Sequence, residues 1–504
     1  MKHKKTISLA LALLMLLSSA SLFGCSESEV NSETEAQAKT EVQAQAGEIA
    51  ETEPEEDVDS RLSIPDNLPD VKFDSKDFKV LTEGVLAGFD YTTEIAVEDL
   101  TGDTCNDAVY NRNILIEDRF DAKIAVDPYE EAYKQIMTLE QAGGGEYHLV
   151  GIRDHCAQSP IRAQILLNWL DIPHVDLTQP WHIQLANDDA TVNGQLYAIA
   201  SDLSITAMVY TYATYCNATR VADYGYSADD FYGYVKEGTW TIDKLMSIAN
   251  TMYVDLNGDG IKDRNDQYGY GYCVVNPADV WATAFGERSF VFNADGTDLD
   301  FPFGSEKMAD VLSKLVDWHY NGEGFYKMDG QYAEETNFLN GKVMMAPLRL
   351  LASFNALRDM DDTYIILPYP KWDEAQTGYY TNADDKFSNF GVPISMVNDT
   401  EFIGVIYEAL CAESYKTVYP AYYDTALKGR YSADPTTAEM IDLIMDGRAF
   451  DFGAQFYVAY YYKVRDLINE ENSDAASYYA STLKAQRLSA VSFFNKYYGT
   501  DIPR

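Results

Sequence analysis

Basic residues are scarce in this sequence. Its 504 residues include 38 Lys and Arg against 80 Asp and Glu, which gives a formal net charge of −42. A surface with this charge repels the phosphates of nucleic acids and of anionic lipids. We therefore expect no nucleic-acid partner.

Cysteine and histidine are also scarce, with six of each. The cysteines beyond position 25 are scattered, odd in number and without a Cys-x-x-Cys pair: Cys105, Cys156, Cys216, Cys273 and Cys411. This pattern favours neither a disulfide framework nor a zinc site, and it predicts buried free thiols. The sequence contains no His-Glu-x-x-His motif, Gly-x-Ser-x-Gly elbow or phosphate loop, so we expect no enzyme.

Only one long apolar run is present, at residues 7–23. With about 17 residues it is shorter than the roughly 20 that a spanning helix needs, and its basic start is typical of a secretory signal over residues 1–24. The setting Leu22-Phe23-Gly24-Cys25 resembles the lipobox of bacterial lipoproteins. It implies lipid attachment at Cys25 and a place on the extracellular face of the cell membrane. The alternative is an ordinary secreted protein with an incidental cysteine.

Residues 25–68 are rich in Glu, Ala, Gln, Thr and Ser and contain few large apolar side chains. Such a segment cannot bury enough surface to order itself, and its like charges extend it. We expect an acidic, disordered tether that holds a folded body away from the membrane.

Strand and helix patterns alternate in the next part of the chain. The expected elements are a strand at 71–81, a helix at 106–120, a strand at 122–126, a helix at 130–141 and a strand at 147–152. This order is typical of an α/β fold with a parallel sheet. The pattern restarts after Leu203, which indicates two lobes, and the tail at 454–498 is expected to be helical and to pack across both.

The segment 255–266 has the register of an EF-hand-type calcium loop. Oxygen ligands fall at the expected positions, with glycine at position 6: Asp255, Asn257, Asp259, the carbonyl of Ile261, Asp263 and Asp266. Position 12 is aspartate where sensor loops have glutamate. We expect a structural Ca²⁺ site, and the alternative is a solvated acidic turn without a metal.

Taken together, these features resemble the extracellular solute-binding lipoproteins of Gram-positive ABC importers, a family that includes sugar and oligosaccharide binders. The loop DLNGDGIKDRNDQYGYG, the stretch NWLDIP before QPW, and VNGQLY carry the resemblance, as do GTWT and ILPYPK. It extends from about Asp70 to Gly453.

The resemblance implies a two-lobed, periplasmic-binding-protein-like fold of type II, with a cleft between the lobes and a helical C-terminal region. Residues 69–200 and 345–395 are assigned to lobe I, and residues 201–344 and 396–504 to lobe II. Closure around a solute would precede delivery to ABC permease subunits in the membrane. We expect a monomer whose solute is an oligosaccharide.

Sugar sites combine aromatic platforms with carboxylates and amides. Seven residues near expected element ends or lobe crossings are candidates for ligand binding: Trp181, Asp202, Trp281, Arg349, Trp372, Tyr380 and Asn382. For each tryptophan the alternative is a core position, and for Asp202 it is a helix N-cap. The functional alternatives are a binder of peptides or other solutes on the same scaffold, an extracellular carbohydrate-active enzyme, and a cell-surface adhesion module.

Overall fold

A computed structural model describes residues 60–293, 295–430, 434–456 and 460–504. The expected signal, Cys25 and most of the expected tether lie outside these residues. None of the helices in the described part of the chain is long and apolar enough to cross a bilayer.

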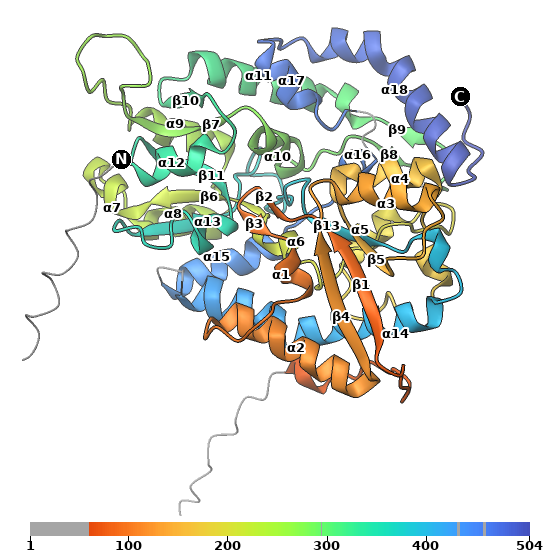
Figure 1. The fold of residues 1–504 in the computed structure, drawn as a ribbon. Coiled ribbons are helices and arrows are strands. Elements are labelled where there is room, and N and C mark those ends of the chain that lie inside the picture. Colours follow the sequence, from red (N-terminus) through yellow and green to blue (C-terminus); the bar gives the residue numbers. More distant parts are fainter. Residues whose placement is uncertain (1–59, 294, 431–433, 457–459) are drawn as a thin grey trace, which may run out of the picture. The chain divides into compact units, whose positions relative to one another are not determined.

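The first lobe is built on a four-stranded sheet with the order β13-β5-β1-β4 (Figure 1). Its strands are β1 (Lys76–Thr82), β4 (Ala122–Pro128), β5 (Leu149–Arg153) and β13 (Ser388–Gly391). Strand β1 runs parallel to both β4 and β5, whereas β13 returns antiparallel to β5. The expected parallel arrangement is therefore confirmed for the first three strands.

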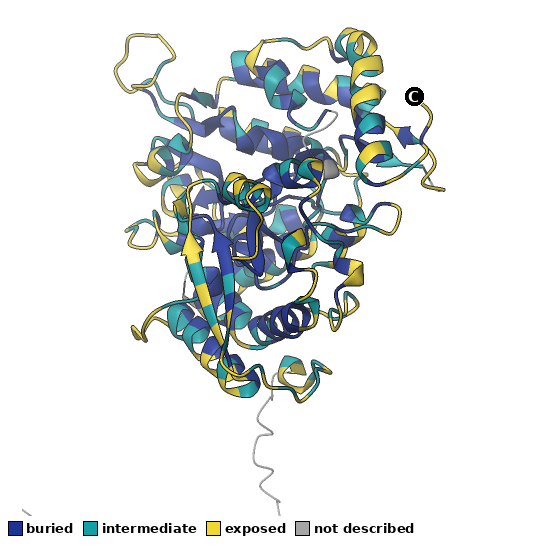
Figure 2. Ribbon diagram, turned by 45° about the vertical axis from the view of Figure 1, so that its right-hand side comes forward, coloured by how far each residue is buried: buried dark blue, intermediate teal, exposed yellow. Residues whose placement is uncertain are grey.

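The second lobe contains a five-stranded sheet with the order β10-β7-β11-β6-β12. Its strands are β6 (Tyr212–Asn217), β7 (Tyr268–Cys273), β10 (Phe325–Met328), β11 (Val343–Arg349) and β12 (Tyr364–Leu367). Two short hairpins, β2 (Val85–Leu86) with β3 (Phe89–Asp90) and β8 (Val291–Phe292) with β9 (Leu299–Asp300), lie outside the sheets. Every residue of β6, β7 and β11 is buried, and much of the interior in Figure 2 is dark blue.

Helices separate most of the strands. Those before β6 are α1 (Thr92–Ile95), α2 (Thr104–Phe120), α3 (Ala132–Gln141), α4 (Gln158–Ala163), α5 (Gln184–Ala190) and α6 (Thr206–Val209). Those from β6 to β12 are α7 (Ala218–Val221), α8 (Ala228–Lys236), α9 (Ile242–Asn250), α10 (Asn276–Ala284), α11 (Glu306–Asn321), α12 (Ala333–Leu339) and α13 (Leu351–Phe354). After β13 follow α14 (Thr400–Glu413), α15 (Pro435–Asp446), α16 (Phe452–Gln455), α17 (Lys463–Asn469) and α18 (Ala475–Tyr497).

Two segments belong to a different lobe from the one expected. Strands β11 and β12 pair with β6, so residues 345–367 lie in the second lobe rather than the first. Helix α14 packs into the core of the first lobe, where its Phe402 contacts Phe78 of β1. A wholly buried strand or helix has the same apolar pattern in either lobe, so the sequence does not distinguish the two placements.

The folded body also begins earlier than expected. Residues 60–68, assigned to the tether, contact it through the pair of Arg61 with Asp424 at 2.5 Å and through Arg119 Nη2, which donates to Asp66 Oδ1 at 3.1 Å. Ile64 and Leu68 pack against the core of the first lobe. Burial of these two apolar side chains stabilises the ordered conformation at the end of the acidic segment.

The C-terminal helix α18 contacts both lobes, as expected. Arg487 donates to the carbonyl of Leu299 in the second lobe at 3.1 Å. At the other end of the helix, the guanidinium of Arg162 lies 4.6 Å from the ring centre of Phe493, and Asn193 Nδ2 donates to the carbonyl of Tyr498 at 2.8 Å. Figure 1 shows this helix running past α11 and α17 toward α4.

Candidate functional site

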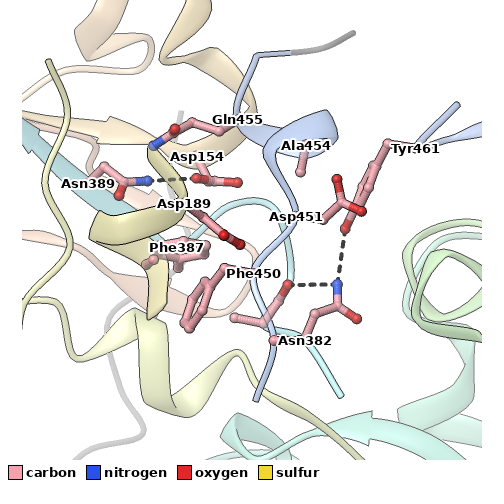
Figure 3. Close-up of a pocket in the computed structure, with 13 residues that line it drawn as sticks. Asp154, Asp189, Asn382, Phe387, Asn389, Phe450, Asp451, Ala454, Gln455 and Tyr461 are labelled. Atoms are coloured by element: carbon pink, nitrogen blue, oxygen red, sulfur yellow. Dashed lines mark hydrogen bonds between the residues drawn. The ribbon is translucent and has the colours of Figure 1, made fainter. Parts of the chain in front are cut away.

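A small cavity lies between the two lobes, with a volume of about 30 Å³. Figure 3 shows Asp154 and Asn389 from the first lobe on one side of it, and Asn382 and Tyr461 on the other. This volume matches roughly one water molecule, whereas small-molecule sites commonly occupy about 300–1,000 Å³. A larger solute therefore requires the lobes to separate.

Asp154 reaches this cavity because it directly follows β5, at the carboxyl end of a strand that runs parallel to β1. Asn389 lies on the antiparallel neighbour β13, and its Nδ2 donates to Asp154 Oδ1 at 2.8 Å. Burial raises the pKa of Asp154 well above its usual range, and the hydrogen bond from Asn389 offsets only part of this effect. In the empty cavity burial therefore favours the neutral, protonated form of this carboxyl group.

The opposite wall carries an amide, a phenol and a second carboxyl group. Asn382 Nδ2 donates to the hydroxyl of Tyr461 at 3.0 Å, while Asn382 Oδ1 is buried and has no partner. Asp451 accepts the backbone N–H groups of Ser289 at 2.7 Å and Gly453 at 2.6 Å. Burial raises the pKa of Asp451, and these hydrogen bonds lower it in part.

A second cavity of about 10 Å³ shares Asp451 and Tyr461 with the first. It is also lined by Asp279 of α10, whose Oδ2 accepts a hydrogen bond from Arg465 Nη1 at 2.9 Å. Asp279 Oδ1 is buried without a partner, and burial raises the pKa of this carboxyl group despite Arg465. Each small cavity is therefore lined by a residue that carries a buried oxygen without a hydrogen-bond partner.

A much larger groove of about 870 Å³ lies beside the two small cavities. The end of α5, the β8–β9 hairpin and residues 499–502 line it. Asp189 lines both this groove and the first cavity, and Arg288 lines both the groove and the second. These two side chains form an ion pair, so a pair that joins the lobes stands between the groove and the buried cavities.

The segment that crosses between β12 and β13 adds charged groups to the interlobe region. Lys386 Nζ lies 2.9 Å from Asp384 Oδ1 and 3.3 Å from Asp385 Oδ1, and Tyr462 donates to Asp385 Oδ2 at 2.6 Å. Burial by itself raises the pKa of Asp385, but the charges of Lys386 and His155 hold it below its usual range. These charged contacts hold the segment between β12 and β13 in place between the two lobes.

Of the seven expected ligand residues, Asn382 is the one that lines the first cavity. Trp181 and Trp281 are both 0% exposed. The indole N–H of Trp181 donates to Glu408 at 2.9 Å, and that of Trp281 donates to Tyr272 at 2.6 Å. Both tryptophans are core residues and offer no platform to a solute.

The remaining four lie away from the first cavity. Trp372 is half-buried and packs against Phe285 with ring centres 5.2 Å apart, and Tyr380 lies beside Gly286. Asp202 lines a different cavity, and burial raises its pKa to about 7. Arg349 is buried in the second lobe and donates to the carbonyl of Ala87, in the turn between β2 and β3, at 3.0 Å, so it offers no open face to a solute.

Sequence reasoning missed Asp154, Asp189, Asp279, Arg288, Asp451 and Tyr461. Asp154 had a usable signal, because a polar residue directly after a buried parallel strand lies at the sheet edge where ligands bind. The sequence carried no such signal for Asp451 and Tyr461, since their positions depend on how the C-terminal segment packs against the two lobes.

The acidic loop 255–266 uses its side chains to accept hydrogen bonds from its own backbone. Asp255 accepts from Gly258 N at 2.7 Å and from Gly260 N at 2.8 Å. Asp266 is 1% exposed, and its Oδ1 is a buried acceptor without a partner. Within the described residues, no three acidic, histidine or cysteine side chains converge closely enough to hold a metal ion. The oxygen-rich residue types and the orphaned Asp266 oxygen nevertheless fit a hard cation such as Ca²⁺.

The fold resembles those of solved solute-binding proteins. Maltose-bound MalE3 of T. maritima superposes with a TM-score of 0.52 at 14% sequence identity, covering 81% of this chain and 99% of that one. The ABC substrate-binding protein Lmo0181 from Listeria monocytogenes, in complex with cycloalternan, gives a TM-score of 0.49 at 13% identity, covering 85% of this chain and 100% of that one. No protein-family model and no curated protein matches the sequence. The expected periplasmic-binding-protein-like fold is thus confirmed.

Proposed function

We propose that this protein is the solute-binding component of an ABC importer and that it captures a carbohydrate between its two lobes. The observation that carries the proposal is a cavity lined by carboxyl, amide and phenol groups from both lobes, in a fold shared with a maltose-bound protein. Hydroxyl-rich solutes satisfy such groups. The cavity of about 30 Å³ fits a closed arrangement that opens to admit an oligosaccharide and closes again before delivery to the permease.

We also propose where the protein is located. Acylation of Cys25 would tie a monomer to the extracellular face of the cell membrane, and the acidic segment that follows would let it reach a permease. The setting Leu22-Phe23-Gly24-Cys25 supports this part. A single acyl chain holds only reversibly, so stable anchoring requires more than one chain.

Calcium is the third part of the proposal. Extracellular loops with a Kd near 10⁻⁴–10⁻³ M are filled at extracellular calcium concentrations. Ca²⁺ in the loop 255–266 would accordingly stabilise the second lobe by mass action. The loop lies between α9 and β7, outside the three interlobe cavities, so its role would be structural.

A thermal-shift panel of oligosaccharides, peptides and polyamines, measured on the purified protein with calcium present, tests the function. We expect a glycan to raise the Tm and to be recovered chemically intact. A glycan recovered as hydrolysis products would indicate a carbohydrate-active enzyme instead. A shift with peptides and with no glycan would overturn the carbohydrate assignment.

A further inference from the structure

The buried cavities between the lobes contain more carboxyl groups than they contain positive partners. Four aspartates line them or their boundary: Asp154, Asp189, Asp279 and Asp451. Arg288 pairs with Asp189, and Arg465 pairs with Asp279. Asp154 and Asp451 accept their hydrogen bonds from neutral donors, namely the Asn389 amide and the N–H and hydroxyl groups around Ser289 and Gly453. The positive charge that acts on Asp451 is that of Arg288, which is already paired with Asp189.

Burying a carboxyl group without a positive partner is costly, and a bound cation removes that cost. Protonation is the alternative for an empty cavity, and burial favours it at Asp154, as the raised pKa of that carboxyl group indicates. A ligand that brings its own positive charge would let the carboxyl groups ionise and would form charge-assisted hydrogen bonds with them.

Two orphaned oxygens point to the same ligand chemistry independently of charge. Asp279 Oδ1 and Asn382 Oδ1 are buried without a partner, on residues that are 4% and 6% exposed and that line the second and first cavities. A buried acceptor without a donor costs about 1–3 kcal/mol in general. Both cavities therefore favour a ligand group rich in N–H or O–H donors.

The dimensions fit a small donor group attached to a larger body. The first cavity, with about 30 Å³, has room for a group the size of a water molecule or an ammonium. The adjoining groove of about 870 Å³ has room for several sugar rings, and the pair of Arg288 with Asp189 separates the two spaces. Opening this pair would connect them.

We propose that the ligand is an amino-bearing oligosaccharide whose ammonium group enters the cavity beside Asp154 and Asp451, while its remaining rings occupy the groove beside Asp189 and Arg288. This inference rests on the proposed carbohydrate-binding function and specifies its substrate class. It also assigns specificity to Asp154 and Asp451, because hydroxyl groups of a neutral sugar would satisfy the orphaned oxygens without balancing the charge.

Calorimetric titration with three probes tests the proposal: the glucosamine trimer, its fully N-acetylated counterpart and maltotriose. We expect the glucosamine trimer to bind at least about tenfold more tightly than the other two, and Asp154→Asn to remove most of that preference. Asp451→Asn provides a second variant if Asp154→Asn does not fold. Asp300→Asn changes the net charge equally at an exposed position of β9, outside the two cavities and the groove, and should keep the preference.

Equal or tighter binding of a neutral trimer would overturn the amine assignment and leave carbohydrate binding in place. The amine assignment is also overturned if Asp154→Asn and Asp451→Asn weaken binding of the neutral and amino probes equally. It is overturned as well if Asp300→Asn loses the preference for the amino probe to the same extent as these two variants. If the Tm responds to peptides but to none of the glycans, the proposed function itself fails. The two failures are therefore distinguishable.

Discussion

Arg288, which follows α10 in the second lobe, forms an ion pair with Asp189 of α5 in the first lobe. Arg288 Nη1 also donates to the carbonyl of Phe450 at 2.8 Å. The side chains of the pair are 35% and 32% exposed, so the pair combines a direct interlobe contact with access to solvent. This ion pair therefore separates the groove from the two buried cavities.

We predict that Arg288→Met increases the population of open protein. A partly exposed ion pair is worth about 1 kcal/mol or less, so the open population should rise by up to about fivefold. Small-angle scattering of the unliganded protein measures this as a larger radius of gyration. The matched control is Arg220→Met, because Arg220 and Asp362 form a pair at 2.6 Å within the second lobe. An equal expansion in the control, or none in Arg288→Met, would contradict the assignment.

A second prediction concerns Glu94, which is 0% exposed and accepts hydrogen bonds from Thr206 N at 2.5 Å and Ser388 Oγ at 2.7 Å. Burial raises its pKa from 4.5 to about 7. Between these values the folded state binds more protons than the unfolded state, so the free energy of unfolding falls as pH rises through this window.

Glu94→Gln should remove that contribution, which amounts to at most about 3 kcal/mol. Urea unfolding at pH 5 and pH 8 measures the effect: the wild type should lose more stability than the variant over this interval. Exposed Glu98→Gln is the control and should follow the wild type. Parallel pH profiles for the wild type and Glu94→Gln would rule the prediction out.

His319 gives the opposite pH dependence. Burial lowers its pKa from 6.5 to about 3; its ring lies 4.3 Å from that of Phe325, and its Nε2 has no partner. The unfolded state therefore binds the extra proton between these values, and stability falls as pH falls through the window. At pH 5 this costs about 2 kcal/mol relative to pH 7.

We expect His319→Phe to lose less stability than the wild type between pH 7 and pH 5, as measured by urea unfolding. His174→Gln is the control, since His174 is exposed beside Glu401. If His319→Phe loses as much stability as the wild type on acidification, another group carries the acid sensitivity.

The calcium proposal predicts a Tm that depends on divalent cations. At 1 mM Ca²⁺ and a Kd near 10⁻⁴ M, binding stabilises the protein by about 1.4 kcal/mol, so EDTA should lower the Tm by about 1–3 °C. Asp255→Ala should show a lower Tm with no response to EDTA. Asp310→Ala, on an exposed site of α11, should respond as the wild type does. A transition unchanged by EDTA would count against the site.

The lipid anchor predicts that Cys25→Ser moves the protein from the membrane fraction to the medium. Cell fractionation followed by immunoblotting measures the distribution, and metabolic labelling with a fatty acid should lose its signal in the same variant. Ser26→Ala leaves the acylated cysteine in place and should remain in the membrane fraction. Membrane retention of Cys25→Ser would contradict lipid anchoring at this residue.

Local patterns predicted the first lobe well. Helices α2 and α3 and strand β4 lie where helical spacing, a glycine stop signal and alternation predicted them. Strand β5 lies where a short apolar run predicted a buried strand. The five cysteines beyond position 25 are free and buried, as their number and scatter indicated. Where a property depends on neighbours along the chain, sequence was sufficient.

Properties that depend on distant partners were not predictable in the same way. Trp181 and Trp281 resembled sugar platforms because both lie near element ends, yet Glu408 and Tyr272 satisfy their indole groups inside the cores. Strand β11 is buried along its whole length and apolar from Val343 to Leu348, so its sequence does not indicate the lobe to which it belongs. The cavity residue Asp451 is positioned by Ser289, which lies 162 residues away in sequence.

The central claim, closure of two lobes around a solute, is tested most directly by single-molecule energy transfer between dyes on the two lobes. Ile114→Cys on α2 and Leu339→Cys on α12 replace exposed residues, and the five native thiols in the described body are buried, which permits selective labelling. A control pair within the first lobe uses Ile114→Cys with Leu170→Cys. We predict that a glycan that raises the Tm shortens the interlobe distance and leaves the control distance unchanged. An unchanged interlobe distance while that glycan is bound would contradict the account.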